Sequence, residues 1–197
     1  MRLGLFGGTF DPPHVGHITV ANAALVRLGL ERVIFMPAGN PWLKTGTPVT
    51  EACHRVQMTR MATEHNPKFE VSEMETNRLG PSYTVETLRE LNSMERGTRD
   101  LYLIVGLDAL VEFDLWHNPS EILDLATLAG YRRLGFEDVP RRSLEVVRRG
   151  SSSDVSLIEG PLANISSTVV RERVSLGRSI ARMVPCRVEE YILTTEL

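Results

Sequence analysis

The chain has 197 residues, of which 42% are hydrophobic and 24% charged, and its formal net charge is −3. These values are typical of a globular protein with one large domain, and the small negative charge disfavours general binding to nucleic acid or anionic membranes. No run of about 18 apolar residues is present, so we expect no membrane span. Cys53 and Cys186 are far apart in the sequence, which predicts neither a disulfide nor a metal site and fits a cytoplasmic protein. The sequence leaves a homo-oligomer open.

Short apolar runs alternate with helical patterns along the chain, which predicts an α/β fold. The expected strands are residues 3–6, 32–36, 69–74, 101–105, 126–130 and 155–158. The expected helices are residues 15–28, 51–64, a stretch after Ser82, 119–124, 168–176 and 188–193. We therefore expect an open, mainly parallel, Rossmann-like sheet with helices on both faces. Residues 1–197 would form a single domain, with a small C-terminal helical extension from about residue 160 that packs on the sheet.

The segment GGTFDPPHVGH, residues 7–17, lies between the first expected strand and the first expected helix. Glycines at its start let a ligand approach the backbone, and the helix beginning near Val15 would point its free N–H groups at the same place. These features predict a phosphate site, toward which His14 and His17 would face from the first helical turn. Asp11 and the two histidines could instead hold a metal ion. Because the sequence shows no further cluster to complete that set, we expect no metal held by protein side chains.

This segment is similar to the HxGH signature of the nucleotidyltransferase superfamily, and its full form most resembles the nicotinate-nucleotide adenylyltransferases. Six further matches follow in the same order, at residues 37–44 (PAGNPWLK), 54–55 (HR), 81–84 (PSYT), 104–108 (IVGLD), 116–117 (WH) and 165–171 (ISSTVVR). Class I aminoacyl-tRNA synthetases also contain an HxGH element. They need a much longer chain and a different second loop, so the small adenylyltransferases fit better.

The resemblance implies transfer of AMP from ATP to nicotinate mononucleotide, giving deamido-NAD and pyrophosphate, with Mg²⁺ arriving on ATP. The implied catalytic residues are His14, His17, Lys44 and Arg171. The implied ATP-binding residues are Gly7, Gly8, Thr9, Phe10, Gly106, Asp108, Arg133, Ser166 and Ser167. The implied residues for the mononucleotide are Lys44, Arg55, Tyr83, Thr84, Trp116 and His117. Tyr83 and Thr84 would present backbone N–H groups to the nicotinate carboxylate, and Trp116 would stack on the pyridine ring.

Several alternatives remain at this stage. Arg132 or Arg133 could be the basic residue that contacts phosphate after the fifth expected strand, and we choose Arg133. Arg55 could orient the substrate or pair with a carboxylate. A sister enzyme would use nicotinamide mononucleotide or phosphopantetheine as the acceptor. A protein of a different class would bind ATP or NAD as a sensor without turnover, but such a protein has no need for His14, His17 and Arg171.

Overall fold

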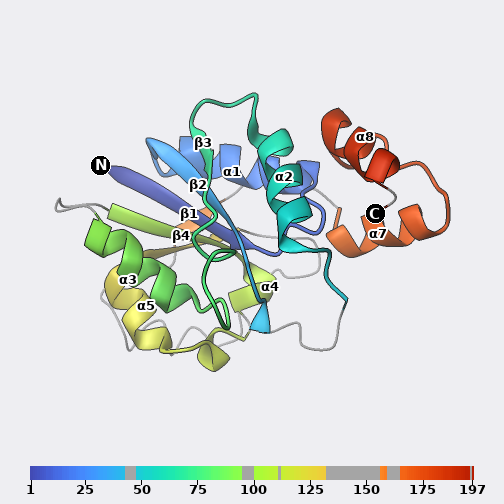
Figure 1. The fold of residues 1–197 in the computed structure, drawn as a ribbon. Coiled ribbons are helices and arrows are strands. Elements are labelled where there is room, and N and C mark those ends of the chain that lie inside the picture. Colours follow the sequence, from blue (N-terminus) through green and yellow to red (C-terminus); the bar gives the residue numbers. More distant parts are fainter. Residues whose placement is uncertain (43–47, 95–99, 111, 132–155, 159–164, 196) are drawn as a thin grey trace.

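The structure is a computed structural model that describes residues 1–42, 48–94, 100–110, 112–131, 156–158, 165–195 and 197 (Figure 1). Its elements are β1 (Arg2–Gly8), α1 (Val15–Arg27), β2 (Arg32–Pro37), α2 (Ala52–Thr63), β3 (Phe69–Val71), α3 (Thr84–Met94), β4 (Asp100–Gly106), α4 (Leu107–Leu110), the 3-10 helix η2 (Phe113–Leu115), α5 (Pro119–Leu125), β5 (Thr127–Tyr131), β6 (Ser156–Ile158), α7 (Ser167–Ser175) and α8 (Cys186–Thr195).

The strands form one sheet in the order β3-β2-β1-β4-β5-β6, and every neighbouring pair is parallel. This confirms the expected α/β fold with an open parallel sheet. The strand order reverses between β1 and β4, where Phe6 lies opposite Ile104. In open parallel sheets, ligands bind beyond the carboxyl ends of the strands at such a reversal. The third strand ends at Val71 and is shorter than predicted. The Ser72 N–H still donates to the Phe35 carbonyl of β2, and the chain then enters a turn over residues 74–76.

Helices cover both faces of the sheet, with α1 and α2 on one face and α3 and α5 on the other (Figure 1). Alternate residues of β1 enter the two cores: Leu3 and Leu5 pack with α3 and α5, whereas Phe6 packs with α1. The apolar faces of α1 and α3 are therefore buried as the helical spacing of the sequence predicts. Gly4 lies on the α1 side of the sheet, where there is no room for a side chain, because an added Cβ would lie 2.8 Å from Leu30 Cδ1.

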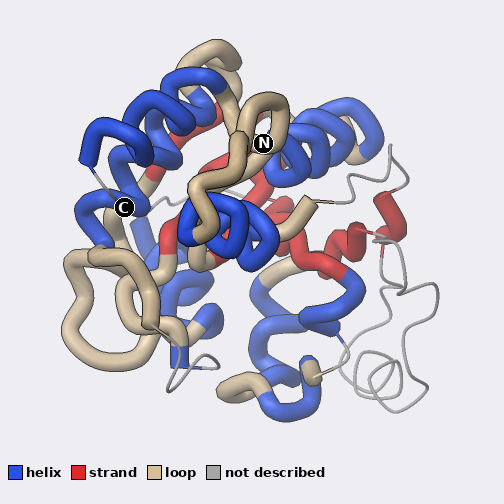
Figure 2. The backbone as a smooth tube through the Cα atoms, turned by 90° about the vertical axis from the view of Figure 1, so that its right-hand side faces the viewer, coloured by secondary structure: helices blue, strands red, loops and turns tan. Residues whose placement is uncertain are grey.

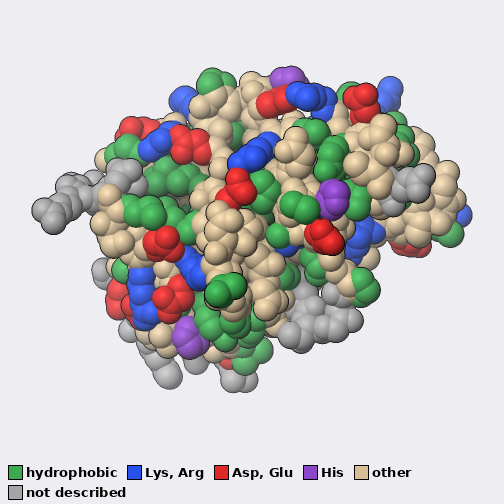
Figure 3. All heavy atoms as spheres, in the orientation of Figure 1, with side chains coloured by type: hydrophobic (Ala, Val, Ile, Leu, Met, Phe, Trp, Pro, Cys, Tyr) green, Lys and Arg blue, Asp and Glu red, His purple; other side chains and the backbone are tan. Residues whose placement is uncertain are grey.

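The expectation that the C-terminal helices pack on the sheet is wrong, because α7 and α8 lie beside α2 (Figures 1 and 2). A third apolar cluster joins these three helices through Met58, Ala62, Val170, Ile180, Val184, Val188 and Ile192. Within the described parts of the chain, none of the helices has both the length and the apolar character needed to cross a bilayer. The face seen in Figure 3 has basic and acidic side chains interspersed.

Candidate active site

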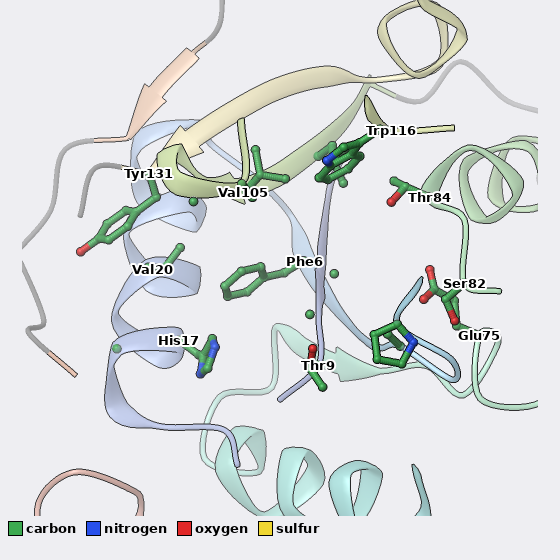
Figure 4. A pocket seen from close by; sticks show the side chains of 18 of the residues that line it. Phe6, Thr9, His17, Val20, Glu75, Ser82, Thr84, Val105, Trp116 and Tyr131 are labelled. Atoms are coloured by element: carbon green, nitrogen blue, oxygen red, sulfur yellow. The ribbon is translucent and has the colours of Figure 1, made fainter. Parts of the chain in front are cut away.

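A cavity of about 350 Å³ opens at the carboxyl ends of β1 and β4, where the strand order reverses. It is lined by Phe6, Gly7, Gly8, Thr9, His14, Gly16, His17, Val20, Ala38, Pro41, Trp42, Glu75, Ser82, Thr84, Leu103, Val105, Gly106, Ala109, Trp116, Tyr131 and Ile165. Figure 4 shows Phe6 near its middle, with His17, Val20 and Tyr131 on one side and Glu75, Ser82, Thr84 and Trp116 on the other. The cavity therefore has two ends of different chemistry.

The glycine-rich loop forms one wall of this cavity. No atom of the described residues lies within 4 Å of a Cβ built on Gly7, so this position faces open space in that part of the structure. A Cβ on Gly8 would lie 3.1 Å from the ring of Phe10. Phe10 itself is only 1% exposed and packs edge-on against Phe6, with ring centroids 5.6 Å apart. The structure thus places Phe10 beneath the loop as an anchor, whereas Gly7, Gly8 and Thr9 line the cavity.

The two histidines lie together at the start of α1. His14 is the N-cap residue, and its backbone N–H donates to Nδ1 of His17 at 3.1 Å. Their rings stack with centroids 3.8 Å apart. Since Nδ1 of His17 accepts a hydrogen bond, the neutral ring carries its proton on Nε2 and can act as a donor through that atom. Both histidines line the cavity, as the three-residue spacing predicts.

The ISSTVVR segment, residues 165–171, also reaches the glycine-rich loop. Ser166 is the N-cap of α7 and accepts a hydrogen bond from the Val169 N–H at 3.2 Å. Ser167 Oγ donates to the Pro12 carbonyl at 2.9 Å. Arg171 Nη1 donates to the Asp11 carbonyl at 2.5 Å and lies 3.9 Å from the Asp11 carboxylate. The predicted residues of α7 are therefore next to the loop but contact its Asp11–Pro12 side.

Arg55 lies behind the cavity rather than in its lining. The side chain is buried, with 1% of the residue exposed, and its guanidinium donates to three backbone carbonyls. The acceptors are Thr50 at 2.8 Å, Thr9 at 2.8 Å and Gly39 at 3.3 Å. Burial lowers the pKa of Arg55, and the Asp11 carboxylate partly opposes this effect. The sequence left open whether Arg55 orients the substrate or pairs with a carboxylate. This geometry does not favour contact with the substrate, because the guanidinium is occupied in joining three loops.

At the end of the cavity opposite the histidines, Ser82 holds the loop that follows β2, and Glu75 lies beside that loop. Ser82 Oγ accepts the N–H groups of Gly39 and Asn40 at 2.9 and 3.1 Å. Thr87 Oγ1 donates to Glu75 Oε1 at 2.7 Å. Burial raises the pKa of Glu75, while hydrogen bonds from Thr87 and Ser82 and the charge of Arg78 oppose the rise. Gly39 has no room for a side chain, since a Cβ there would lie 2.2 Å from the Glu75 carbonyl oxygen.

The residues expected to recognise the pyridine ring gather at this end. Thr84, the first residue of α3, lines the cavity together with Trp116. The Tyr83 and Trp116 N–H groups already donate to Pro81 and Phe113, at 3.1 Å each. Thr84 and His117 have backbone N–H groups without an acceptor among the described residues. The rings of Tyr83 and His117 stack at 4.3 Å, and neither residue is part of the cavity lining. The buried Nε1 of Trp116 likewise has no acceptor in the described part of the chain.

Some predicted residues are outside the described part of the structure. Lys44, Arg132 and Arg133 belong to ranges that are not described, and the same holds for the side chain of Asp108. Gly106 lines the cavity at the end of β4, as expected. Sequence reasoning missed Glu75, Val20 and Tyr131 in the lining. An acidic residue shortly after a strand could have pointed to Glu75, whereas Val20 and Tyr131 carry no signal that separates them from core residues.

The comparisons with known proteins agree with this geometry. The chain matches the cytidylyltransferase-like family over residues 5–173. Relatives named "probable nicotinate-nucleotide adenylyltransferase" from Saccharopolyspora erythraea and Thermomicrobium roseum are each 41% identical over 191 residues, which cover 97% of this chain and 86% and 88% of theirs. The structure of Plasmodium falciparum nicotinic acid mononucleotide adenylyltransferase complexed with NaAD shares the fold, with a TM-score of 0.78 and 18% identity over 100% of this chain and 96% of that chain. The chain therefore belongs to the cytidylyltransferase-like family and, within it, to the nicotinate-nucleotide adenylyltransferases.

Proposed function

We propose that this chain transfers AMP from ATP to nicotinate mononucleotide and releases deamido-NAD and pyrophosphate. The observation that carries this proposal is a single cavity with the HxGH histidines near one end and Thr84 and Trp116 at the other. A dinucleotide product needs such a site, with one end for each nucleotide. The names of the relatives that align with almost the whole chain support the same reaction.

In this proposal the nucleophile is the 5′-phosphate of the mononucleotide. Its second pKa is about 6, so it is mostly ionised at neutral pH and needs no general base. His14 and His17 then act as donors that stabilise charge on the α-phosphate during in-line attack. The His17 Nδ1 contact with the loop backbone orients the ring for this role. Gly7, Gly8 and Thr9 let the phosphates approach the backbone closely.

The departing pyrophosphate would be held on the side of the loop that faces α7. The side chain of Arg171 is 35% exposed, and among the described residues its guanidinium makes one short contact, to the Asp11 carbonyl, so it can turn from Asp11 toward phosphate. Ser166 and Ser167 bring the N-terminus of α7 to the same place. We include Lys44, Asp108 and Arg133 in this proposal through the resemblance alone. Mg²⁺ belongs to the substrate as MgATP, held by phosphate oxygens and water.

The nicotinate carboxylate would be recognised at the start of α3. Among the described residues, the N–H groups of Thr84 and His117 are the backbone donors left there, since those of Tyr83 and Trp116 already donate to carbonyls. The indole of Trp116 would cover the pyridine ring. Of the two backbone donors expected from the sequence, Thr84 is kept in this assignment. Tyr83 is replaced by His117, because the Tyr83 N–H already donates to the Pro81 carbonyl.

The decisive experiment measures pyrophosphate release from MgATP with nicotinate mononucleotide, nicotinamide mononucleotide or phosphopantetheine as the acceptor. We expect the nicotinate compound to have the highest kcat/KM and the His17→Ala variant to lose most of this turnover. A higher kcat/KM with another acceptor would assign the chain to a sister reaction. If ATP binds but none of the three acceptors supports turnover, the chain would be a sensor.

We also propose a cytoplasmic location. Both Cys53 and Cys186 are free thiols, which fits this location.

A further inference from the structure

Three potential metal ligands lie together at the start of α2, outside the cavity described above. Glu51, Cys53 and His54 each place one ligand atom within 4.8 Å of the others. Glu51 and Cys53 are exposed and His54 is partly buried. None of the three lines the cavity, and the proposed adenylyl transfer does not use them. We propose that Glu51, Cys53 and His54 bind one divalent transition metal ion, preferably Zn²⁺, with water completing the coordination.

The separation of two of these ligand atoms fits a tetrahedral zinc ion. Zinc bonds of about 2.3 Å to sulfur and about 2.0–2.2 Å to a carboxylate oxygen place those two atoms about 3.5–3.7 Å apart at the tetrahedral angle. Cys53 Sγ lies 3.7 Å from Glu51 Oε2. Here the thiol points its proton at the carboxylate. Zinc would take the place of that proton, which passes to the solvent as the thiolate binds the ion.

His54 is already oriented by a residue of another helix. Its Nδ1 lies 2.8 Å from the hydroxyl of Tyr191, which belongs to α8. This contact leaves Nε2 as the ring nitrogen for a metal ion. Histidine ligands commonly bond through their other ring nitrogen to an oxygen, which fixes the ring and increases its basicity. Tyr191 would supply that oxygen.

The chemistry of the three ligands indicates which ion would bind. A thiolate and an imidazole favour zinc over Mg²⁺, which prefers oxygen ligands. Glu51 is the N-cap residue of α2, but its side chain makes no capping hydrogen bond, so metal binding would not remove one. A cation at a helix N-terminus is opposed by the helix dipole. The negative charges of the carboxylate and the thiolate offset that effect.

The sequence predicted no metal site because Cys53 and Cys186 are far apart along the chain. In the folded chain the ligands instead come from one turn of the backbone and include one carboxylate. The group also adjoins the loop that bears the histidines. Thr50, the residue before Glu51, donates its N–H to Asp11 Oδ2 at 3.3 Å. A bound ion would therefore order the beginning of α2 next to this loop.

The test is titration of the metal-free, full-length protein with ZnCl₂ by calorimetry and with CoCl₂ by absorption spectroscopy. We expect one ion per chain and a thiolate-to-cobalt charge-transfer band, and millimolar Mg²⁺ should not displace the ion. The Cys53→Ser variant should lose the band, whereas Cys186→Ser, which changes the other exposed cysteine, should retain it. Tyr191→Phe should weaken zinc binding by about 10- to 100-fold, because it removes only the residue that orients His54.

Three results would overturn the proposal. The first is the absence of saturable zinc binding. The second is binding that Cys53→Ser leaves unchanged. The third is binding that His17→Ala abolishes, since this would place the ion at the histidine loop. The exposed positions of Glu51 and Cys53 make their substitution compatible with folding, which circular dichroism can verify.

Discussion

A proline at position 84 would test carboxylate recognition through a single backbone donor. Thr84 is the first residue of α3, a position where proline is well tolerated because its missing N–H has no helical acceptor. The substitution Thr84→Pro therefore removes the proposed donor while the helix still begins at the same place. Its matched control is Thr84→Ala, which removes the hydroxyl group but retains the N–H.

The size of the effect follows from the charge of the acceptor. A hydrogen bond to a charged group contributes about 1.5–3 kcal/mol, and a neutral one about 0.5–1.5 kcal/mol. We expect Thr84→Pro to lower kcat/KM for nicotinate mononucleotide by about 10- to 150-fold and that for the nicotinamide compound by at most about tenfold. The ratio of the two kcat/KM values, measured by pyrophosphate release at fixed MgATP, should fall about tenfold. An unchanged ratio, or the same fall in Thr84→Ala, would refute recognition by this N–H.

Four further substitutions test the rest of the site. His17→Ala should lower kcat by about 100- to 1,000-fold with the fold retained, as steady-state kinetics and circular dichroism would show; near-normal turnover would remove His17 from the mechanism. Arg171→Lys should raise KM for ATP more than KM for the mononucleotide, because an ammonium group cannot make the planar two-donor contact with phosphate; the opposite order would place Arg171 elsewhere. Arg55→Ala should lower the free energy of unfolding by about 3–5 kcal/mol in urea titrations, since it leaves buried carbonyls and the Asp11 charge without their partner; a loss in kcat/KM alone would instead indicate direct substrate contact. Burial raises the pKa of Glu75. The free energy of unfolding of the wild type, relative to that of Glu75→Gln, should therefore be highest below pH 4.5 and should fall as the pH rises through the folded-state pKa. A pH-independent difference would contradict a buried, titrating carboxyl group.

The alternation of strands and helices was predictable because each element has a local pattern. The strand after Met1 and the helix after His14 follow from short apolar runs and helical spacing alone. The histidine loop was also predictable, since its glycines, prolines and histidines are contiguous. Its position at the strand-order reversal then follows from the general behaviour of parallel sheets.

The parts that were not predictable depend on contacts between distant residues. Arg55 has the appearance of a surface residue on a helix, and only the folded chain shows that three carbonyls surround its guanidinium. Phe10 is within the signature segment, yet its side chain turns into the core at a φ of 50°. Tyr83 and Thr84 could not be ranked as donors, because the hydrogen bond from Tyr83 to Pro81 becomes visible only in three dimensions. A motif therefore located the site but did not assign a task to each of its members.

The contacts between α7 and the histidine loop have a consequence for the order in which the site can form during synthesis. Ser167 and Arg171 bond to carbonyls that precede them by 155 and 160 residues, and the Val15 N–H donates to the Met183 carbonyl at 2.9 Å. A ribosome makes the loop first but must finish almost the entire chain before these partners exist. Contacts between such distant residues also form slowly, because closing a long loop costs entropy. A nascent chain that ends before α7 should thus have its sheet and its histidines but an unsupported loop, and catalytic competence should appear only once the C-terminal helices have docked.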